Sequence, residues 1–209
     1  MRVEKHGRMN WKGSALIAPE SLLDDRGRRV MWAWACEGCN AAAQKAAGWS
    51  GVFTLPRILD LEADGSLRIE PAEELNRLRL NPKRGKQTVL ARDTEIALPG
   101  VHGNTLELNF ELDAKQASLF GIKLLASPDG GEHTTVSFDL GAKSVRIDLS
   151  RSSLSPDVFY PWPHPRSAHH PMGGPWNKEA VWEQTAPLDR REGENLNVRL
   201  FLDRSILEL

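Results

Sequence analysis

The sequence predicts an all-β protein, and two observations support this fold class. Apolar residues fall at every second position in short segments, most clearly in 106–112 (LELNFEL), which places them on one face of a sheet. Several such segments follow one another at short spacing in the second half of the chain, a pattern typical of a β-sandwich. Only one short stretch, 71–78, has a good helical pattern.

The first half predicts two hairpins. Segment 24–27 (DDRG) has the composition of a turn, and 28–34 (RRVMWAW) reads as the strand that follows it. A second turn is predicted at 63–66 (ADGS), because Asp-Gly between the apolar segments 58–61 and 67–69 is a strong short-range hairpin signal.

The remaining segments of the first half are shorter. Segment 36–48 is rich in alanine and glycine and is interpreted as a loop. Segment 49–57 (WSGVFTLPR) predicts a strand ended by its proline, which cannot donate to a sheet ladder. Segment 71–78 (PAEELNRL) predicts a short helix, with proline at its start and Leu75 and Leu78 on one face.

A basic, polar linker is predicted over 81–93, dividing the chain into parts 1–80 and 94–209. The second part is the predicted sandwich, with strands expected at 95–98, 104–112, 118–126, 134–139, 144–149 and 196–202. Between about 150 and 191 the periodicity is lost in a stretch rich in proline, histidine and tryptophan. Long loops of this kind are often functional, but we interpret this one as an insertion without a role.

The charge balance excludes some partners. The 27 basic and 28 acidic side chains nearly cancel, so neither nucleic acid nor an anionic membrane is expected as a partner. No segment approaches the roughly 18 consecutive apolar residues of a membrane span. The N-terminus is positively charged without an apolar core behind it, so no signal peptide is visible. The localisation stays unknown, since a cytoplasmic protein and a piece of a longer secreted one both fit.

No cofactor or metal is expected. Cys36 and Cys39 form a single CxxC, which fits a redox pair or half of a zinc site. Zinc needs about four ligands and no second CxxC or HxxxH is present, so we favour two ordinary thiols in a loop. His164, His169 and His170 lie among prolines with no carboxylate at ligand spacing, which favours an exposed loop.

Three stretches carry a family resemblance. They are 18–34 (APES, an Asp, then GRRVMWAW), 48–79 (GWSGVFTLPR, then DGSL and PAEEL) and 200–208 (LFLDRSILE). In order and spacing they resemble the C-terminal part of glycoside hydrolase family 32, the β-fructosidases of invertase, levanase and inulinase type. The resemblance implies the last strands of a five-bladed β-propeller in 1–80, followed by a C-terminal β-sandwich in 94–209, with both ends incomplete.

The resemblance also implies an activity. A complete enzyme of this family hydrolyses sucrose or fructans with retention, using two carboxylates about 5 Å apart. The family's nucleophilic Asp, stabilising Asp and acid/base Glu lie in W-x-N-D-P-N-G, R-D-P and E-C motifs, and none has a match here. Arg92-Asp93 and Cys36-Glu37 are superficially similar but stand in the wrong places. We therefore expect no catalytic residue in this chain and no activity from the chain alone.

Asn10, Trp11 and Lys12 are the candidate substrate-binding residues. They stand about where the family has an aromatic stretch that touches the sugar, although Asn replaces the expected Asp. An indole can stack on a sugar ring while polar neighbours bind hydroxyl groups. The alternative, which we favour, is a tryptophan packed inside a propeller blade. Trp32, Trp34 and Trp49 are expected in the core for the same reason.

The carboxylates of the first half suggest no acid pair. Glu73 and Glu74 are adjacent on the predicted helix, so their side chains diverge, and we expect a solvated helix face. Asp203-Arg204-Ser205 is interpreted as a turn into a final strand.

Three hypotheses about the whole chain stay open. It is a part of a β-fructosidase, or a non-catalytic carbohydrate-binding or interaction module built on the sandwich. The third is association with a complementing N-terminal polypeptide or with itself, since an incomplete propeller exposes sheet edges and apolar surface.

Overall fold

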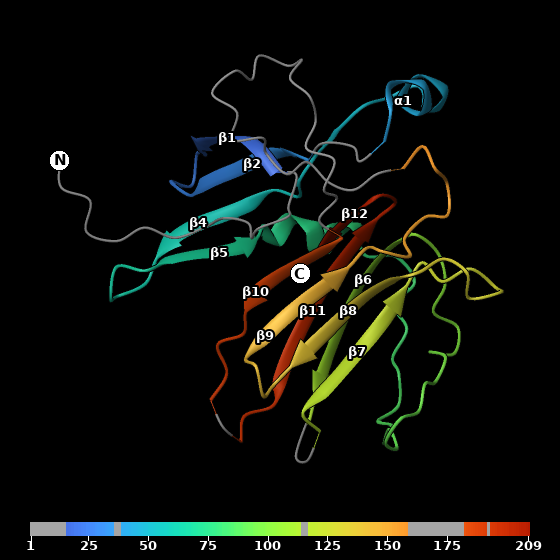
Figure 1. Cartoon of the computed structure of the whole chain (residues 1–209). Helices are drawn as coiled ribbons and strands as arrows, with labels where there is room; N and C mark the ends of the chain where they lie inside the picture. Colours follow the sequence, from blue (N-terminus) through green and yellow to red (C-terminus); the bar gives the residue numbers. More distant parts are fainter. Residues whose placement is uncertain (1–15, 36–38, 114–116, 159–181, 192) are drawn as a thin grey trace.

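The computed structural model describes residues 16–35, 39–113, 117–158, 182–191 and 193–209. Nearly all regular structure in these ranges is β-strand, arranged in three antiparallel sheets, which confirms the all-β class (Figure 1). No helix in the described ranges is long and apolar enough to cross a membrane.

The first sheet holds both predicted hairpins. Its strands follow the order β1-β2-β4-β5, with β3 paired to the end of β2: β1 Leu16–Leu23, β2 Arg29–Ala35, β3 Val52–Phe53, β4 Arg57–Leu61 and β5 Leu67–Pro71. Such a four-stranded antiparallel meander is the unit from which β-propeller blades are built. Val30, Met31 and Ala33 of the central strand are buried.

Two further sheets face each other and enclose the main core, as the sandwich prediction requires. One has the order β10-β9-β8-β7 and the other β12-β11-β6: β6 Thr105–Leu112, β7 Leu119–Leu124, β8 Thr134–Asp139, β9 Ser144–Asp148, β10 Glu183–Pro187, β11 Leu196–Asp203 and β12 Ile206–Glu208. Buried side chains alternate along both β8 and β11. The core cluster contains Leu124, Val136, Phe138, Val198, Leu200 and Leu202.

The loop interpretation of 36–48 is wrong for its second half, where α1 spans Ala41–Ala47. The Asn40 side chain accepts a hydrogen bond from the Ala43 amide at 2.8 Å, which satisfies one of the free donors of the first turn. Gly48 ends the helix with φ +84°, the left-handed conformation that glycine adopts without strain. The sequence therefore carried a helix signal, since an N-cap asparagine, a run rich in alanine and a terminating glycine follow one another.

Two other predictions for the first half are wrong in detail. The segment 49–57 is not one strand: Val52–Phe53 form β3, and Arg57, after the proline, already begins β4. The predicted helix is a 3₁₀ helix, η1 Glu73–Leu78, and it begins later than predicted because Pro71 is still paired in the first sheet. Its one buried residue is Leu75, and Leu78 is 73% exposed.

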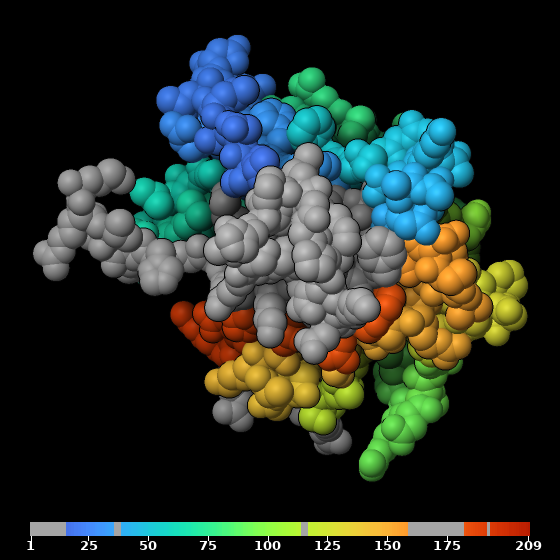
Figure 2. All heavy atoms as spheres, turned by 45° about the horizontal axis from the view of Figure 1, so that its top comes forward, coloured from blue at the N-terminus to red at the C-terminus, as the bar shows by residue number. Residues whose placement is uncertain are grey.

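The sandwich part departs from prediction in two places. Residues 95–98 are not a strand; they belong to an irregular segment, 79–104, that passes beside β7, where the Glu95 carboxylate pairs with Lys123. This segment is drawn in green in Figures 1 and 2. Inside the predicted loop 150–191, residues Glu183–Pro187 form β10 along the edge of β9. Its sequence EQTAP carries too few apolar residues to show a strand pattern.

Candidate functional site

The carboxylate of Glu208, at the end of β12, joins the sandwich to the first sheet. It accepts a hydrogen bond from the Leu55 amide at 2.7 Å and two from the Arg57 guanidinium, at 3.1 Å from Nε and 2.7 Å from Nη2. The side chains of Arg57 and Glu208 are only 16% and 14% exposed. Two of the stretches noted in the sequence, LPR and DRSILE, therefore meet across 151 residues of chain.

A second charged cluster lies where η1 reaches the sandwich. Glu107 of β6 accepts hydrogen bonds from Arg79 at 2.6 Å and from Arg199 of β11 at 2.7 Å. Arg199 also donates to the Asn76 side chain in η1 at 3.2 Å. The Arg79 hydrogen bonds and those from Asn109 and Arg199 lower the pKa of Glu107 to about 2, although burial opposes them. Figure 1 shows η1 lying between β5 and the sandwich strands.

A third contact ties α1 to the sandwich. The Asn40 amide group donates to the Asp157 carboxylate at 2.6 Å, and its backbone N–H donates to the Asp157 carbonyl at 3.0 Å. Cys39 and Val158 form an isolated β-bridge beside it. Both halves of the chain thus share polar contacts at three separate places.

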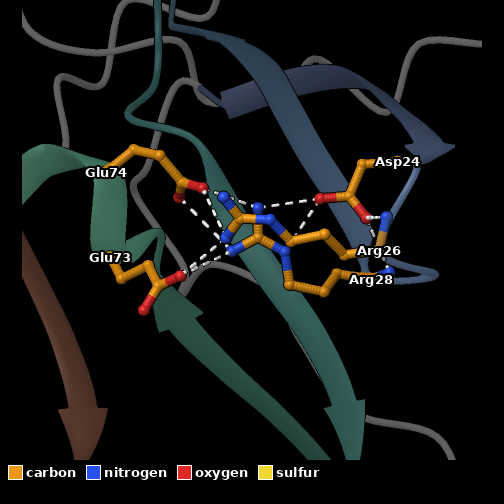
Figure 3. A network of polar contacts seen from close by, with 5 residues as sticks. All are labelled: Asp24, Arg26, Arg28, Glu73 and Glu74. Atoms are coloured by element: carbon orange, nitrogen blue, oxygen red, sulfur yellow. Dashed lines mark hydrogen bonds and ion pairs between the residues drawn. The ribbon is translucent and has the colours of Figure 1, made fainter.

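Between the β1–β2 turn of the first sheet and η1, five charged side chains form the network drawn in Figure 3. Arg28 is held between Asp24 and Glu74, with distances of 2.7 Å to each carboxylate, and Arg26 reaches Glu73 at 2.8 Å. The hydrogen bond from Arg28 lowers the pKa of Glu74. The Glu73 and Glu74 side chains are 68% and 39% exposed, as expected of a solvated helix face, and both also fix η1 to the β1–β2 turn.

None of the carboxyl groups with a shifted pKa in the described residues has the electrostatics of a general acid. A general acid in such a reaction needs a pKa raised toward neutrality. Among the described residues, every carboxyl group with a shifted pKa has it lowered, namely Asp24, Asp60, Glu74, Glu107, Asp129 and Asp148. Arg92 and Asp93 pair with each other at 3.3 Å on fully accessible side chains. The described residues form no metal-binding cluster either.

The expectation that the tryptophans lie in the core is wrong for two of them. Trp34 is 38% exposed and Trp49 is 41% exposed, whereas Met31 and Ala33, on the opposite face of β2 from Trp34, are buried. The Trp34 indole lies over Gly51, where an added Cβ would stand 1.8 Å from its Nε1 atom. Trp34 therefore packs against the backbone of Gly51, just before β3.

The predicted substrate-binding residues Asn10, Trp11 and Lys12 lie outside the described residues, as do Cys36, Glu37, His164, His169 and His170. The turn Asp203-Arg204-Ser205 is present between β11 and β12, with Arg204 at φ +54°. The contacts of Glu208 and Glu107 were missed by sequence reasoning, because their partners are far away in the chain. For the contacts of Glu208, the only signal in the sequence was that LPR and DRSILE both belong to the stretches that carry the family resemblance.

Two family models match successive parts of the chain. Residues 4–71 match the glycosyl hydrolases family 32 N-terminal domain, and residues 74–209 match the glycosyl hydrolases family 32 C-terminal model. The first match ends with the last residue of β5, and the second begins inside η1.

Curated relatives are β-fructofuranosidases and fructan exohydrolases. The β-fructofuranosidase insoluble isoenzyme 7 of Oryza sativa subsp. indica is 31% identical over 92% of this chain and 36% of its own length. The fructan 1-exohydrolase of Bromus pictus is 26% identical over 91% of this chain and 35% of its own length. The chain thus spans about a third of the length of the curated relatives that it matches.

Solved structures share the fold. Fructan 1-exohydrolase IIa of Cichorium intybus aligns with a TM-score of 0.74 and 22% identity, over 96% of this chain and 40% of that one. The same enzyme in complex with 1-kestose gives 0.73. The exo-inulinase of Aspergillus awamori gives 0.64, at 17% identity, over 95% of this chain and 36% of that one.

Proposed function

The chain belongs to glycosyl hydrolase family 32, and on this premise we propose that it is the C-terminal part of a β-fructosidase that hydrolyses sucrose or fructans. The observation that supports this most is that two successive family models cover the chain from residue 4 to residue 209 with only two residues between them. The contacts of Glu208 with Leu55 and Arg57 are consistent with it, since they join the two matched parts.

We assign residues 1–80 to the end of the catalytic propeller, 81–93 to a linker and 94–209 to the sandwich. Asn10, Trp11 and Lys12 stay the candidate contacts to a fructosyl unit. The substrate class rests on the names of the relatives, which include fructan exohydrolases and β-fructofuranosidases.

The chain alone should be catalytically inactive, because it contains none of the family's three carboxylate motifs. Retaining hydrolysis needs a nucleophile and a separate acid/base group on either side of the scissile bond. The test is to incubate the purified chain with sucrose, 1-kestose and inulin and to measure released fructose. A family 32 enzyme that is active on these substrates serves as the positive control. Fructose release that copurifies with the chain would overturn the proposal.

A second candidate function is a non-catalytic carbohydrate-binding module. It is favoured by a polar hollow on the outer face of β8, β9 and β10, which involves none of the residues that join the sandwich to the first sheet. Calorimetry with fructo-oligosaccharides discriminates the two functions, since a module binds without turnover. A purely structural part should show neither binding nor turnover.

A further inference from the structure

The outer face of the sandwich carries a polar hollow that spans three strands. Its lining residues are Ser137 and Asp139 of β8, Ser144 and Arg146 of β9, and Glu183 and Thr185 of β10. Ser137, Arg146 and Thr185 are direct cross-strand neighbours, so they form one row across the sheet. Val136 and Phe138, the neighbours of Ser137 along β8, point to the opposite face and belong to the core. We call this feature the outer-face hollow.

The row remains open on the side of β7, because the next position is Gly121. A Cβ at this glycine would stand 2.8 Å from the Val136 carbonyl oxygen, closer than side chains normally approach backbone. The backbone there leaves no space for a larger residue, so no side chain closes this end of the row.

The groups in the hollow are available to a ligand. The Arg146 guanidinium and the Glu183 carboxylate are 3.4 Å apart, and both side chains are about half exposed, so the pair is weak and easily rearranged. Asp139 accepts a backbone hydrogen bond from Ala142 through one oxygen. The hydroxyl groups of Ser137, Ser144 and Thr185 form no hydrogen bond with any described residue.

The chemistry of these groups selects the ligand. One guanidinium and two carboxylates give the hollow a net charge of −1, which disfavours anions such as phosphates. Hydroxyls, carboxylates and a guanidinium together pair with the alternating donors and acceptors of a polyhydroxylated ligand. No aromatic side chain lines the hollow, so it offers no flat surface on which a pyranose ring stacks.

We propose that the outer-face hollow binds a neutral fructosyl oligosaccharide through hydrogen bonds alone, as an auxiliary site that holds fructan chains. The choice of a fructosyl ligand rests on the proposed function. An open polar surface without stacking gives low affinity, so we expect a Kd of about 1 mM.

The test titrates the full chain with the inulin-type tetrasaccharide nystose, using calorimetry and backbone amide shifts. We expect shifts centred on Ser137, Arg146 and Thr185. Arg146→Ala should weaken binding about tenfold, the loss expected for a hydrogen bond to a charged group. Lys123→Ala is the matched control, since Lys123 is an exposed cation of the neighbouring strand β7 that does not line the hollow. It should leave the affinity unchanged.

Three results would overturn the proposal. They are the absence of binding at roughly ten times the expected Kd, an Arg146→Ala affinity equal to that of the wild type, and equal affinity for cellotetraose. These results concern binding by the outer-face hollow. The proposed function fails on a different measurement, the release of fructose by the chain alone.

Discussion

At the scale of single residues, Glu208 illustrates how the two halves of the chain are held together. Its carboxylate and the Arg57 guanidinium are largely shielded from water, so removing either charge leaves the other poorly solvated. Arg68 and Asp60, both in the first sheet, form an ion pair at a similar distance, 2.6 Å. Their side chains, however, are about half exposed. Ion pairs of that second kind contribute little to stability.

Glu208→Gln should therefore destabilise the protein by about 2–3 kcal/mol, near the lower limit for breaking a buried ion pair. Asp60→Asn, the matched change at the exposed pair, should have a much smaller effect. Urea unfolding followed by tryptophan fluorescence measures both. Equal losses in the two variants would contradict the structural role of Glu208.

Glu107 should make the junction sensitive to acid. Its pKa in the folded protein is about 2, below the ordinary value of 4.5, so its contribution is fully present above pH 4.5 and is lost as the pH falls toward 2. Glu107→Gln should cost about 2 kcal/mol at pH 7. The difference between variant and wild type should shrink between pH 5 and pH 2.5 in urea unfolding. A difference that stays constant over this range would show that the charge of Glu107 is unimportant.

Gly51 is required for a reason that Gly65 lacks. Both have positive φ, +74° and +80°, but only at Gly51 would a Cβ meet the Trp34 indole. Gly51→Ala should cost about 2 kcal/mol, and Gly65→Ala about 1 kcal/mol from backbone strain alone. Combining Gly51→Ala with Trp34→Ala should recover the excess in a double-mutant cycle measured by thermal unfolding. Additive losses would exclude the steric explanation.

At the scale of elements, the structure shows which sequence signals were sufficient. The hairpin around Asp64-Gly65 and strand β6, with strict alternation, were predictable because turn chemistry and periodicity agree. α1 was missed although Asn40 and Gly48 mark its ends, since a short alanine run has no apolar face to reveal it. β10 was missed because it is an edge strand of mostly polar residues.

α1 has seven residues, too few for a helix that is stable by itself, so its two polar contacts should decide whether it forms. Asn40→Ala removes both the cap and the side-chain contact with Asp157, and should speed exchange of the Ala43 amide about fivefold, equivalent to about 1 kcal/mol. Asp157→Ala removes only the side-chain contact between the halves and keeps the cap. Hydrogen exchange monitored by NMR should therefore show a smaller effect for Asp157→Ala. Equal rates in the wild type and Asn40→Ala would contradict the capping role.

At the scale of the whole molecule, the order of the parts was predictable but their contacts were not. The resembling stretches indicated propeller strands followed by a sandwich, and the family models follow the same order. The exposure of Glu73 and Glu74 was predictable but their ion pairs were not, because their partners, Arg26 and Arg28, lie more than 40 residues earlier. Local periodicity carries no information about such pairs. The predicted sugar contacts at residues 10–12 stay a prediction.

The first sheet and the segment after it expose large apolar side chains that a globular protein normally covers. Exposed fractions are 77% for Phe53, 67% for Leu61, 60% for Leu23 and 83% for Leu80. Exposed apolar surface, where it is extensive, marks an interaction site or promotes aggregation. We propose that another propeller segment or a second copy of the chain covers it.

The purified chain should therefore self-associate as its concentration rises, and should bind a hydrophobic dye. Phe53→Ser should lower both signals, since it removes the aromatic residue that the first sheet exposes most. Leu154→Ser is the matched control, because Leu154 is 70% exposed but follows β9 in the sandwich. Light scattering after size-exclusion chromatography measures the mass at each concentration. A monomer throughout that binds no dye would show that the exposed side chains need no partner, and the complementation hypothesis would then fail.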